Sequence, residues 1–311
     1  MSQGSASSAC SALIVVTIIR PIRPLVSHNP WHDADVPELP EVEAVRRRLE
    51  VVMRGRRIKR VLLRRKDLRR PFPRAFASRL AGRRIRAVNR RGKYLTVDLD
   101  SGETLLMHLG MSGSFRIERK QQRVVSRGQR VGDLHDHVVF TLSNGVTVTF
   151  NDPRRFGLMD LVSGRHAASN DALASLGPEP LAASFDAAAI ARSLAGKRMA
   201  LKLALLDQRV VAGLGNIYAS EALHLASLSP LRRCSTIATG GRPNSRAVRL
   251  ASAIKTVLHE AIARQERPCR AGRFRVYERE GEPCRTPGCH GTIRRISQAS
   301  RSTFYCPSCQ R

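Results

Sequence analysis

The sequence feature that most constrains the fold of this chain is a set of four cysteines close to the C-terminus. They form two close pairs, Cys284 with Cys289 and Cys306 with Cys309, and residues 290–305 separate the pairs. Two such pairs on two hairpin turns can converge tetrahedrally on one Zn²⁺, a metal that thiolate ligands favour. With four sulfur ligands no position is left for water, so the predicted cofactor is one structural Zn²⁺.

The other three cysteines, Cys10, Cys234 and Cys269, are scattered along the chain. This distribution indicates a metal site in a reducing compartment and not a disulfide framework. His290 adjoins Cys289 in the sequence, but a complete set of four sulfur ligands needs no help from it.

The chain is strongly basic, with 54 Lys and Arg residues against 25 Asp and Glu residues and a formal net charge of +29. Such a chain is expected to bind a polyanion, and nucleic acid is the leading candidate. A basic surface with solvated charges is the alternative. No apolar run approaches the ~18 residues that a membrane span needs, so no membrane partner is expected.

Hydrophobic periodicity predicts an α+β multidomain protein. Residues 38–53 carry apolar positions at helical spacing, and residues 187–265 are again helical. Between them lie short β-type segments joined by turn signals, which are typical of an antiparallel β-sandwich. The predicted strands are Ile58–Leu63, Ile85–Asn89, Tyr94–Leu99, Thr104–His108, Ser114–Glu118, Asp136–Leu142 and Val146–Phe150.

We therefore expect an N-terminal β-sandwich with flanking helices, a helical domain and a C-terminal four-cysteine zinc finger. The run Gly177-Pro178-Glu179-Pro180 marks a linker after the sandwich. The predicted bounds are 37–165 for the sandwich, 166–186 for the linker, 187–268 for the helical domain and 269–311 for the zinc finger.

The stretch Val36-Pro37-Glu38-Leu39-Pro40-Glu41-Val42-Glu43 resembles the start of the formamidopyrimidine-DNA glycosylases, bacterial repair enzymes that excise oxidised purines. In that family the mature protein begins at this proline, whose free secondary amine is the nucleophile. A proline nitrogen inside a chain is a tertiary amide without a proton, whereas a free N-terminal amine titrates near pKa ~8. The resemblance thus implies a working chain that begins at Pro37, and we expect residues 1–36 to be a non-native upstream extension. A helix start rich in Pro and Glu is the plainer interpretation.

The resemblance covers residues 37–311 and implies roles for further side chains. Glu38 would supply and remove protons during opening of the sugar ring. Lys93, in a turn after two arginines, would assist the first β-elimination. Arg301, at the tip of the finger, would contact phosphate near the lesion and assist the second elimination. Without the family, Lys93 is a solvated turn residue and Arg301 a nonspecific phosphate contact.

Two loops are similar to family segments that fill the hole left by an everted base. Met111 in His108–Ser114 and Phe156 in Asn151–Gly157 would be the apolar wedges. Arg154 would hydrogen-bond the orphaned partner base, which should be cytosine opposite an oxidised guanine. For the two wedges, ordinary core packing is the alternative.

Residues 205–221 resemble the helix–two-turns–helix module of the family. The Gly213–Gly215 segment permits a tight turn, and Asn216 with the backbone N–H groups of the next helix would face phosphates. The resemblance also implies DNA contacts for Lys197 and His135. A structural histidine at a strand edge is the competing account for His135.

The implied function is that of a base-excision-repair DNA glycosylase and AP lyase, which removes formamidopyrimidines and 8-oxoguanine from damaged double-stranded DNA. The proline amine would form a Schiff base with the sugar, and β,δ-elimination would cleave the strand. The zinc takes no part in this chemistry. We expect a monomer in the bacterial cytoplasm, associated with the nucleoid.

Two alternatives stay open. Endonuclease VIII-like glycosylases share the architecture but act on oxidised pyrimidines. Segment 261–275 is shorter here than the family loop that closes over everted 8-oxoguanine, which keeps this alternative in play and leaves the preference for 8-oxoguanine in doubt. A noncatalytic zinc-ribbon DNA-binding protein would result if residues 1–36 were retained.

Overall fold

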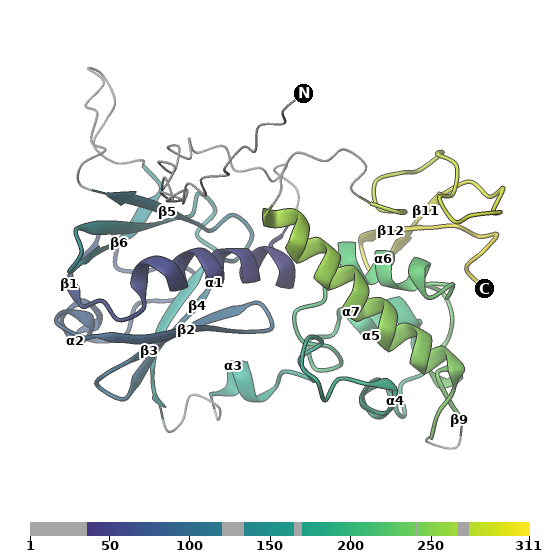
Figure 1. Cartoon of the computed structure of the whole chain (residues 1–311), viewed down its shortest axis with the longest axis horizontal. Helices are drawn as coiled ribbons and strands as arrows, with labels where there is room; N and C mark the ends of the chain where they lie inside the picture. The colour runs from purple at the N-terminus through teal and green to yellow at the C-terminus, as the bar shows by residue number, and fades with distance from the viewer. Residues whose placement is uncertain (1–35, 120–133, 165–169, 240–241, 267–273) are drawn as a thin grey trace, which may run out of the picture. The chain divides into compact units, whose positions relative to one another are not determined.

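The structure is a computed structural model that describes residues 36–119, 134–164, 170–239, 242–266 and 274–311 (Figure 1). Two four-stranded antiparallel sheets, in the orders β1-β6-β7-β5 and β2-β3-β4-β8, form the N-terminal part. Their strands are β1 (Ile58–Leu63), β2 (Ile85–Arg91), β3 (Tyr94–Leu99), β4 (Glu103–His108), β5 (Ser114–Arg119), β6 (Asp136–Leu142), β7 (Val146–Asn151) and β8 (Leu158–Ser163).

Apolar side chains from both sheets and from helix α1 (Leu39–Met53) form the first hydrophobic core. Strand β3 illustrates how the sequence builds this core. Its side chains alternate between buried and half-buried positions, and the buried ones are apolar. The predicted β-sandwich is confirmed. The sequence patterns did not predict β8 or the short helices α2 (Phe76–Leu80) and α3 (Asp171–Ala174).

Four further helices surround a second core. The longest, α7, packs on α1, α4 and α6 (Figure 1). The bounds of these helices are Ala187–Leu194 for α4, Leu201–Leu206 for α5, Asn216–Leu225 for α6 and Ser245–Glu266 for α7, with a short pair of strands, β9 (Ala238–Thr239) and β10 (Arg242–Pro243), before α7. No described helix is long and apolar enough to cross a membrane. In segment 261–275, residues 267–273 lie outside the described part of the chain.

The C-terminal finger is an antiparallel hairpin of β11 (Arg294–Gln298) and β12 (Arg301–Tyr305) with the four cysteines around it. Ile293, Phe304 and Cys306 pack in the same core as the helices, and β12 contacts α6. The finger is therefore anchored to the helical part by shared apolar packing as well as by chain connection.

Candidate active site and zinc site

The carboxylate of Glu38 lies on the N-terminus of α6. Its two oxygens accept hydrogen bonds from the backbone N–H groups of Gly215 (2.8 Å), Ile217 (2.9 Å) and Tyr218 (3.3 Å), and the side chain is buried. The first N–H groups of a helix have no partner within the helix, and the helix dipole favours negative charge there. The residue that follows Pro37 is thus fixed by a helix from a distant part of the sequence.

The surroundings of Glu38 act on its pKa in opposite directions. Burial raises the pKa, whereas the positive charge of Lys93 and the three backbone N–H groups lower it, and the net shift is upward. A carboxyl group with a raised pKa can hold a proton and release it during a reaction. This behaviour agrees with the proton-transfer role expected for Glu38.

Replacement of Gly215 by alanine should displace this carboxylate. A Cβ atom at Gly215 would lie 2.3 Å from Cδ of Glu38, although the backbone φ of −127° suits any residue. A displacement of about 1 Å can cost about 100-fold in rate, so we expect single-turnover excision to fall by about that factor. Gly145→Asn is the control, because this hairpin-turn glycine has open space around it and asparagine tolerates its φ of 78° better than other side chains do. An unchanged rate for Gly215→Ala would show that the position of Glu38 does not limit the reaction.

A second buried carboxyl group, that of Glu41, adjoins this site. It accepts hydrogen bonds from the backbone N–H of Glu38 (3.0 Å), the hydroxyl of Tyr218 (2.6 Å) and the amide of Gln265 (3.0 Å). Burial raises the pKa of Glu41 to about 7; the Tyr218 hydrogen bond opposes this shift and the charge of Glu38 adds to it. Glu41 was expected only to favour the helix dipole from the first turn, whereas it completes a capping box with Glu38.

Lys93 lies in the two-residue turn between β2 and β3, and Glu179 holds that turn in place. The Glu179 carboxylate accepts hydrogen bonds from the backbone N–H of Gly92 (2.9 Å) and from the guanidinium of Arg90 (2.8 Å). Glu179 belongs to the predicted linker, and no sequence motif indicated this contact. The linker thus helps to position a predicted catalytic lysine.

The charges of the predicted catalytic residues act on one another. Burial lowers the pKa of Lys93, the nearby carboxyl groups of Glu38 and Glu41 raise it, and the charge of Arg301 lowers it. The charge of Lys93 is thus coupled to Glu38 at the start of α1 and to Arg301 in the finger. Pro37 is buried beside Glu38.

Arg301 begins β12 and is exposed at the tip of the finger hairpin. The turn before it, Ala299-Ser300, has φ values of 48° and 60°. This left-handed conformation is unfavourable for residues other than glycine. Two consecutive positive φ values are those of a type I′ turn, the common connection of a two-residue hairpin, and Arg301 is the first strand residue after it.

A buried lysine that the sequence analysis missed fixes the finger hairpin to the helices. The ammonium group of Lys202 donates to Oγ1 of Thr303 (2.6 Å), the carbonyl of Ser302 (3.2 Å) and Oδ1 of Asn216 (2.7 Å). Burial lowers the pKa of Lys202 to about 8, with Glu38 raising it and Arg301 lowering it. The sequence feature that could have indicated a buried lysine is the single charge of Lys202 within the apolar run Leu201–Leu206.

Asn216, predicted to face phosphate, has its side-chain amide engaged within the protein. Its oxygen accepts from Lys202, and its nitrogen donates to the carbonyl of Ser302 at 3.0 Å. Lys197 lies with its ammonium nitrogen 3.8 Å from a carboxylate oxygen of Asp207. Half-buried His135 accepts a hydrogen bond at its carbonyl from the N–H of Asp152. The DNA contacts of Asn216, Lys197 and His135 stay predictions.

The two predicted void-filling loops are tied together. The Ser112 hydroxyl donates to the buried carboxylate of Asp152 (2.6 Å) and accepts from the N–H of Arg154 (3.1 Å). Gly110 has a φ of 66°, and a Cβ there would lie 2.4 Å from the carbonyl carbon of Phe156. Close backbone approach at this glycine lets the two loops form one unit.

The side chains that these loops present differ in exposure. Phe156 is 44% exposed, and the Arg154 guanidinium lies 5.1 Å from the centre of its ring. Met111 is half-buried. An exposed phenylalanine under a guanidinium is available to a ligand, and the wedge and base-contact roles of the three residues stay predictions.

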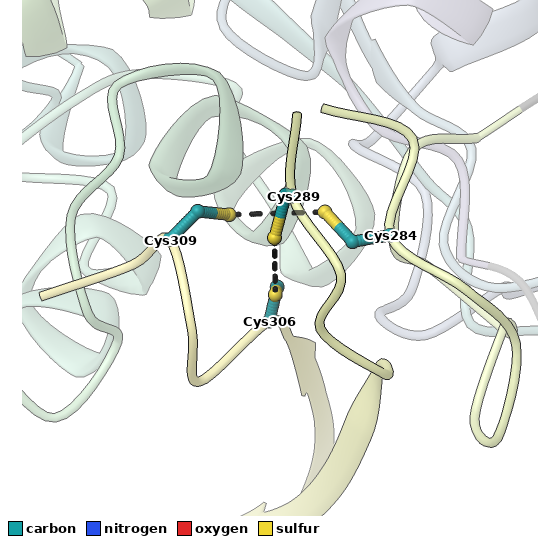
Figure 2. Close-up of side chains that lie close together, drawn as sticks. All are labelled: Cys284, Cys289, Cys306 and Cys309. Atoms are coloured by element: carbon teal, nitrogen blue, oxygen red, sulfur yellow. Dashed lines mark hydrogen bonds between the residues drawn. The ribbon is translucent and has the colours of Figure 1, made fainter. Parts of the chain in front are cut away.

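The four predicted zinc ligands converge in the finger (Figure 2). Their Sγ atoms all lie within 4.8 Å of one another, with Cys284 and Cys309 3.7 Å apart and Cys289 and Cys306 3.6 Å apart. Tetrahedral coordination with Zn–S distances of about 2.3 Å requires sulfur separations of about 3.8 Å. The donor set fits one Zn²⁺, and the prediction of a structural zinc is confirmed.

Three family sequence models match the chain. They describe the formamidopyrimidine-DNA glycosylase N-terminal domain (residues 36–159), the H2TH domain of the same glycosylase (residues 176–271) and a zinc finger found in FPG and IleRS (residues 281–311). With the fold and the site above, these matches define a DNA glycosylase of the helix–two-turns–helix class.

Known proteins agree with this class. The formamidopyrimidine-DNA glycosylases of Azorhizobium caulinodans and Afipia carboxidovorans are 54% and 51% identical to the chain, over 89% of it and 100% of each relative. The crystal structure of the Thermus thermophilus protein has a TM-score of 0.71 and 38% identity, over 88% of this chain and 98% of its own. The Lactococcus lactis protein bound to DNA with an AP site has a TM-score of 0.73 and 30% identity, over 88% and 99%. The chain belongs to the formamidopyrimidine-DNA glycosylase family.

Proposed function

We propose that this protein excises oxidised purines from duplex DNA by attack of the Pro37 amine, with Glu38 as the proton-transfer group. The main support for these residue assignments is the buried carboxylate of Glu38, the residue after Pro37. The N-terminus of α6 hydrogen-bonds this carboxylate, and the charge of Lys93 lowers its pKa. The family is one of glycosylases with AP lyase activity, and the endonuclease VIII-like alternative is not favoured.

The chain's own residues account for each step. The neutral Pro37 amine attacks the anomeric carbon of the damaged nucleotide and gives up its proton, and Glu38 protonates the ring oxygen as the sugar opens. The glycosidic bond from the same carbon then breaks, so the damaged base leaves as the iminium forms. A secondary amine gives an iminium without losing a second proton, and this cation acts as an electron sink for elimination. Lys93, whose charge acts on Glu38, assists β-elimination, and Arg301, whose charge acts on Lys93, assists δ-elimination.

Only a chain that begins at Pro37 can perform the first step, because an amide nitrogen carries no basic lone pair. Two observations support this start. The family sequence model begins to match at residue 36, and relatives matched over their full length cover 89% of this chain. We accordingly keep 1–36 as a segment absent from the working enzyme.

Damaged double-stranded DNA is the partner, as in the solved structure of the Lactococcus lactis protein with AP-site DNA. Apolar wedges at Met111 and Phe156, with Arg154 on the partner base, would stabilise the everted state. The excess of positive charge favours phosphate contacts at Lys197 and elsewhere. We propose a monomer that works on the nucleoid in the bacterial cytoplasm.

Lesion choice provides the test of the function. The Pro37-start protein should excise formamidopyrimidines and 8-oxoguanine opposite cytosine and should be much slower on oxidised pyrimidines in single-turnover assays. Because segment 261–275 is short, formamidopyrimidines should be excised at least as well as 8-oxoguanine. A preference for oxidised pyrimidines would overturn the function, whereas a strong preference for 8-oxoguanine would overturn only the interpretation of the segment.

A further inference from the structure

A buried histidine of α6 lies against the zinc ligands. Nε2 of His224 is 3.3 Å from Sγ of Cys284 and 3.9 Å from Sγ of Cys309. The side chain is only 4% exposed, and its other ring nitrogen, Nδ1, has no hydrogen-bond partner within the described part of the chain. His224 takes no part in the reaction described above, and it is not one of the four metal ligands.

The charge of the thiolates decides which atom carries the proton between His224 and Cys284. A zinc-bound cysteine sulfur is a thiolate and can only accept a hydrogen bond. A lone pair on Nε2 at 3.3 Å would repel it, so Nε2 must carry hydrogen. The resulting N–H···S⁻ contact is charge-assisted and stronger than a neutral one.

Neighbouring groups complete the surroundings of the same sulfur. The backbone N–H of Thr286 donates to Sγ of Cys284 at 3.4 Å, and the Thr286 hydroxyl lies 3.4 Å from this sulfur and 3.3 Å from Nε2 of His224. On the opposite pair, the N–H of Gly291 donates to Cys289 at 3.4 Å. Among the residues that the structure describes, His224 is the contact to these sulfurs that comes from outside the finger.

We propose that His224 is a positioning residue of the zinc site, whose Nε2–H donates to the Cys284 thiolate and stabilises the bound metal. The donor withdraws electron density from the sulfur and makes it less reactive towards oxidants and competing protons. The same helix holds Glu38 at its first turn and the zinc site near its last, so α6 connects the catalytic carboxyl group to the metal.

Zinc affinity of the full chain tests the proposal directly. His224→Phe keeps a ring of similar size but removes the donor, and loss of such outer partners typically costs metal sites 10–100-fold in affinity. We expect zinc affinity, measured by competition with a chromogenic chelator, to fall by about tenfold or more. His290→Gln is the matched control, because exposed His290 adjoins Cys289 in sequence and should leave the affinity unchanged.

A second measurement needs no variant and remains decisive if His224→Phe fails to fold. In the unmutated chain loaded with ¹¹³Cd²⁺, the His224 Nε2–H proton should show an NMR correlation to the metal through the Cys284 sulfur. Wild-type affinity in a folded His224→Phe protein, or no such correlation in the cadmium form, would overturn the proposal.

Discussion

Protein that begins at Pro37 should be trapped covalently on lesion-containing DNA by borohydride, whereas the full 311-residue chain should give no trapped complex. Borohydride reduces an iminium to a stable amine, and the nitrogen of Pro37 can form an iminium only as a free amine, not as an amide. The measurement is the amount of cross-linked product on a denaturing gel, with the N-terminus of each protein verified by mass spectrometry. The expected difference is all or none.

Two variants test the roles of the Pro37 amine and the Glu38 carboxyl group separately in this experiment. Pro37→Gly in the shortened protein leaves a primary amine and should retain weakened turnover. Glu38→Gln removes the proposed proton-transfer group, whose carboxylate α6 holds, so excision should be lost while DNA binding survives. Equal trapping by an intact, unprocessed chain would show that Pro37 is not the nucleophile.

Loss of a zinc ligand should have the second-largest effect. Cys289→Ser should release the metal, unfold the finger and abolish tight DNA binding, because metal binding and local folding are one event worth about 10–16 kcal/mol in small zinc domains. The effect should reach beyond the finger, since Phe304 and Cys306 pack in the core of the helices. Zinc content by atomic emission and DNA affinity by titration are the readouts.

Cys234→Ala is the control for the zinc experiment. Cys234 is buried in the same helical core but lies outside the four-sulfur cluster, so its removal should leave zinc content unchanged. Stoichiometric zinc and full DNA affinity in Cys289→Ser would contradict the assignment of the ligand.

Local patterns in the sequence predicted much of the fold. Strands β1, β3 and β6 have the predicted bounds, and α1 starts within one residue of the predicted position. Alternation and turn residues are local properties, so they can be identified without knowledge of the partner strand. Strand β8 was missed because its Asp160 interrupts a short apolar run that also follows a predicted loop.

Contacts between distant segments could not be predicted in this way. Gly215 appeared to serve a tight turn, yet its φ is ordinary and the Glu38 carboxylate occupies the space of its absent Cβ. Lys202 and His224 interact with residues of the finger, far along the chain. Sequence periodicity cannot predict these contacts, because each contact depends on how segments that are distant in the sequence pack in the folded protein.

The first residues after Pro37 pack in both cores: Leu39 belongs to the core of the helices and Val42 to the core of the sandwich. A growing polypeptide completes the sandwich strands before α6 is made, and at that stage the proline amine would have no organised acid beside it. If Pro37 and Glu38 act as proposed, we expect chemical competence only at the end of folding, when both cores are complete. A nascent or partly unfolded chain should then leave the DNA that it contacts uncut.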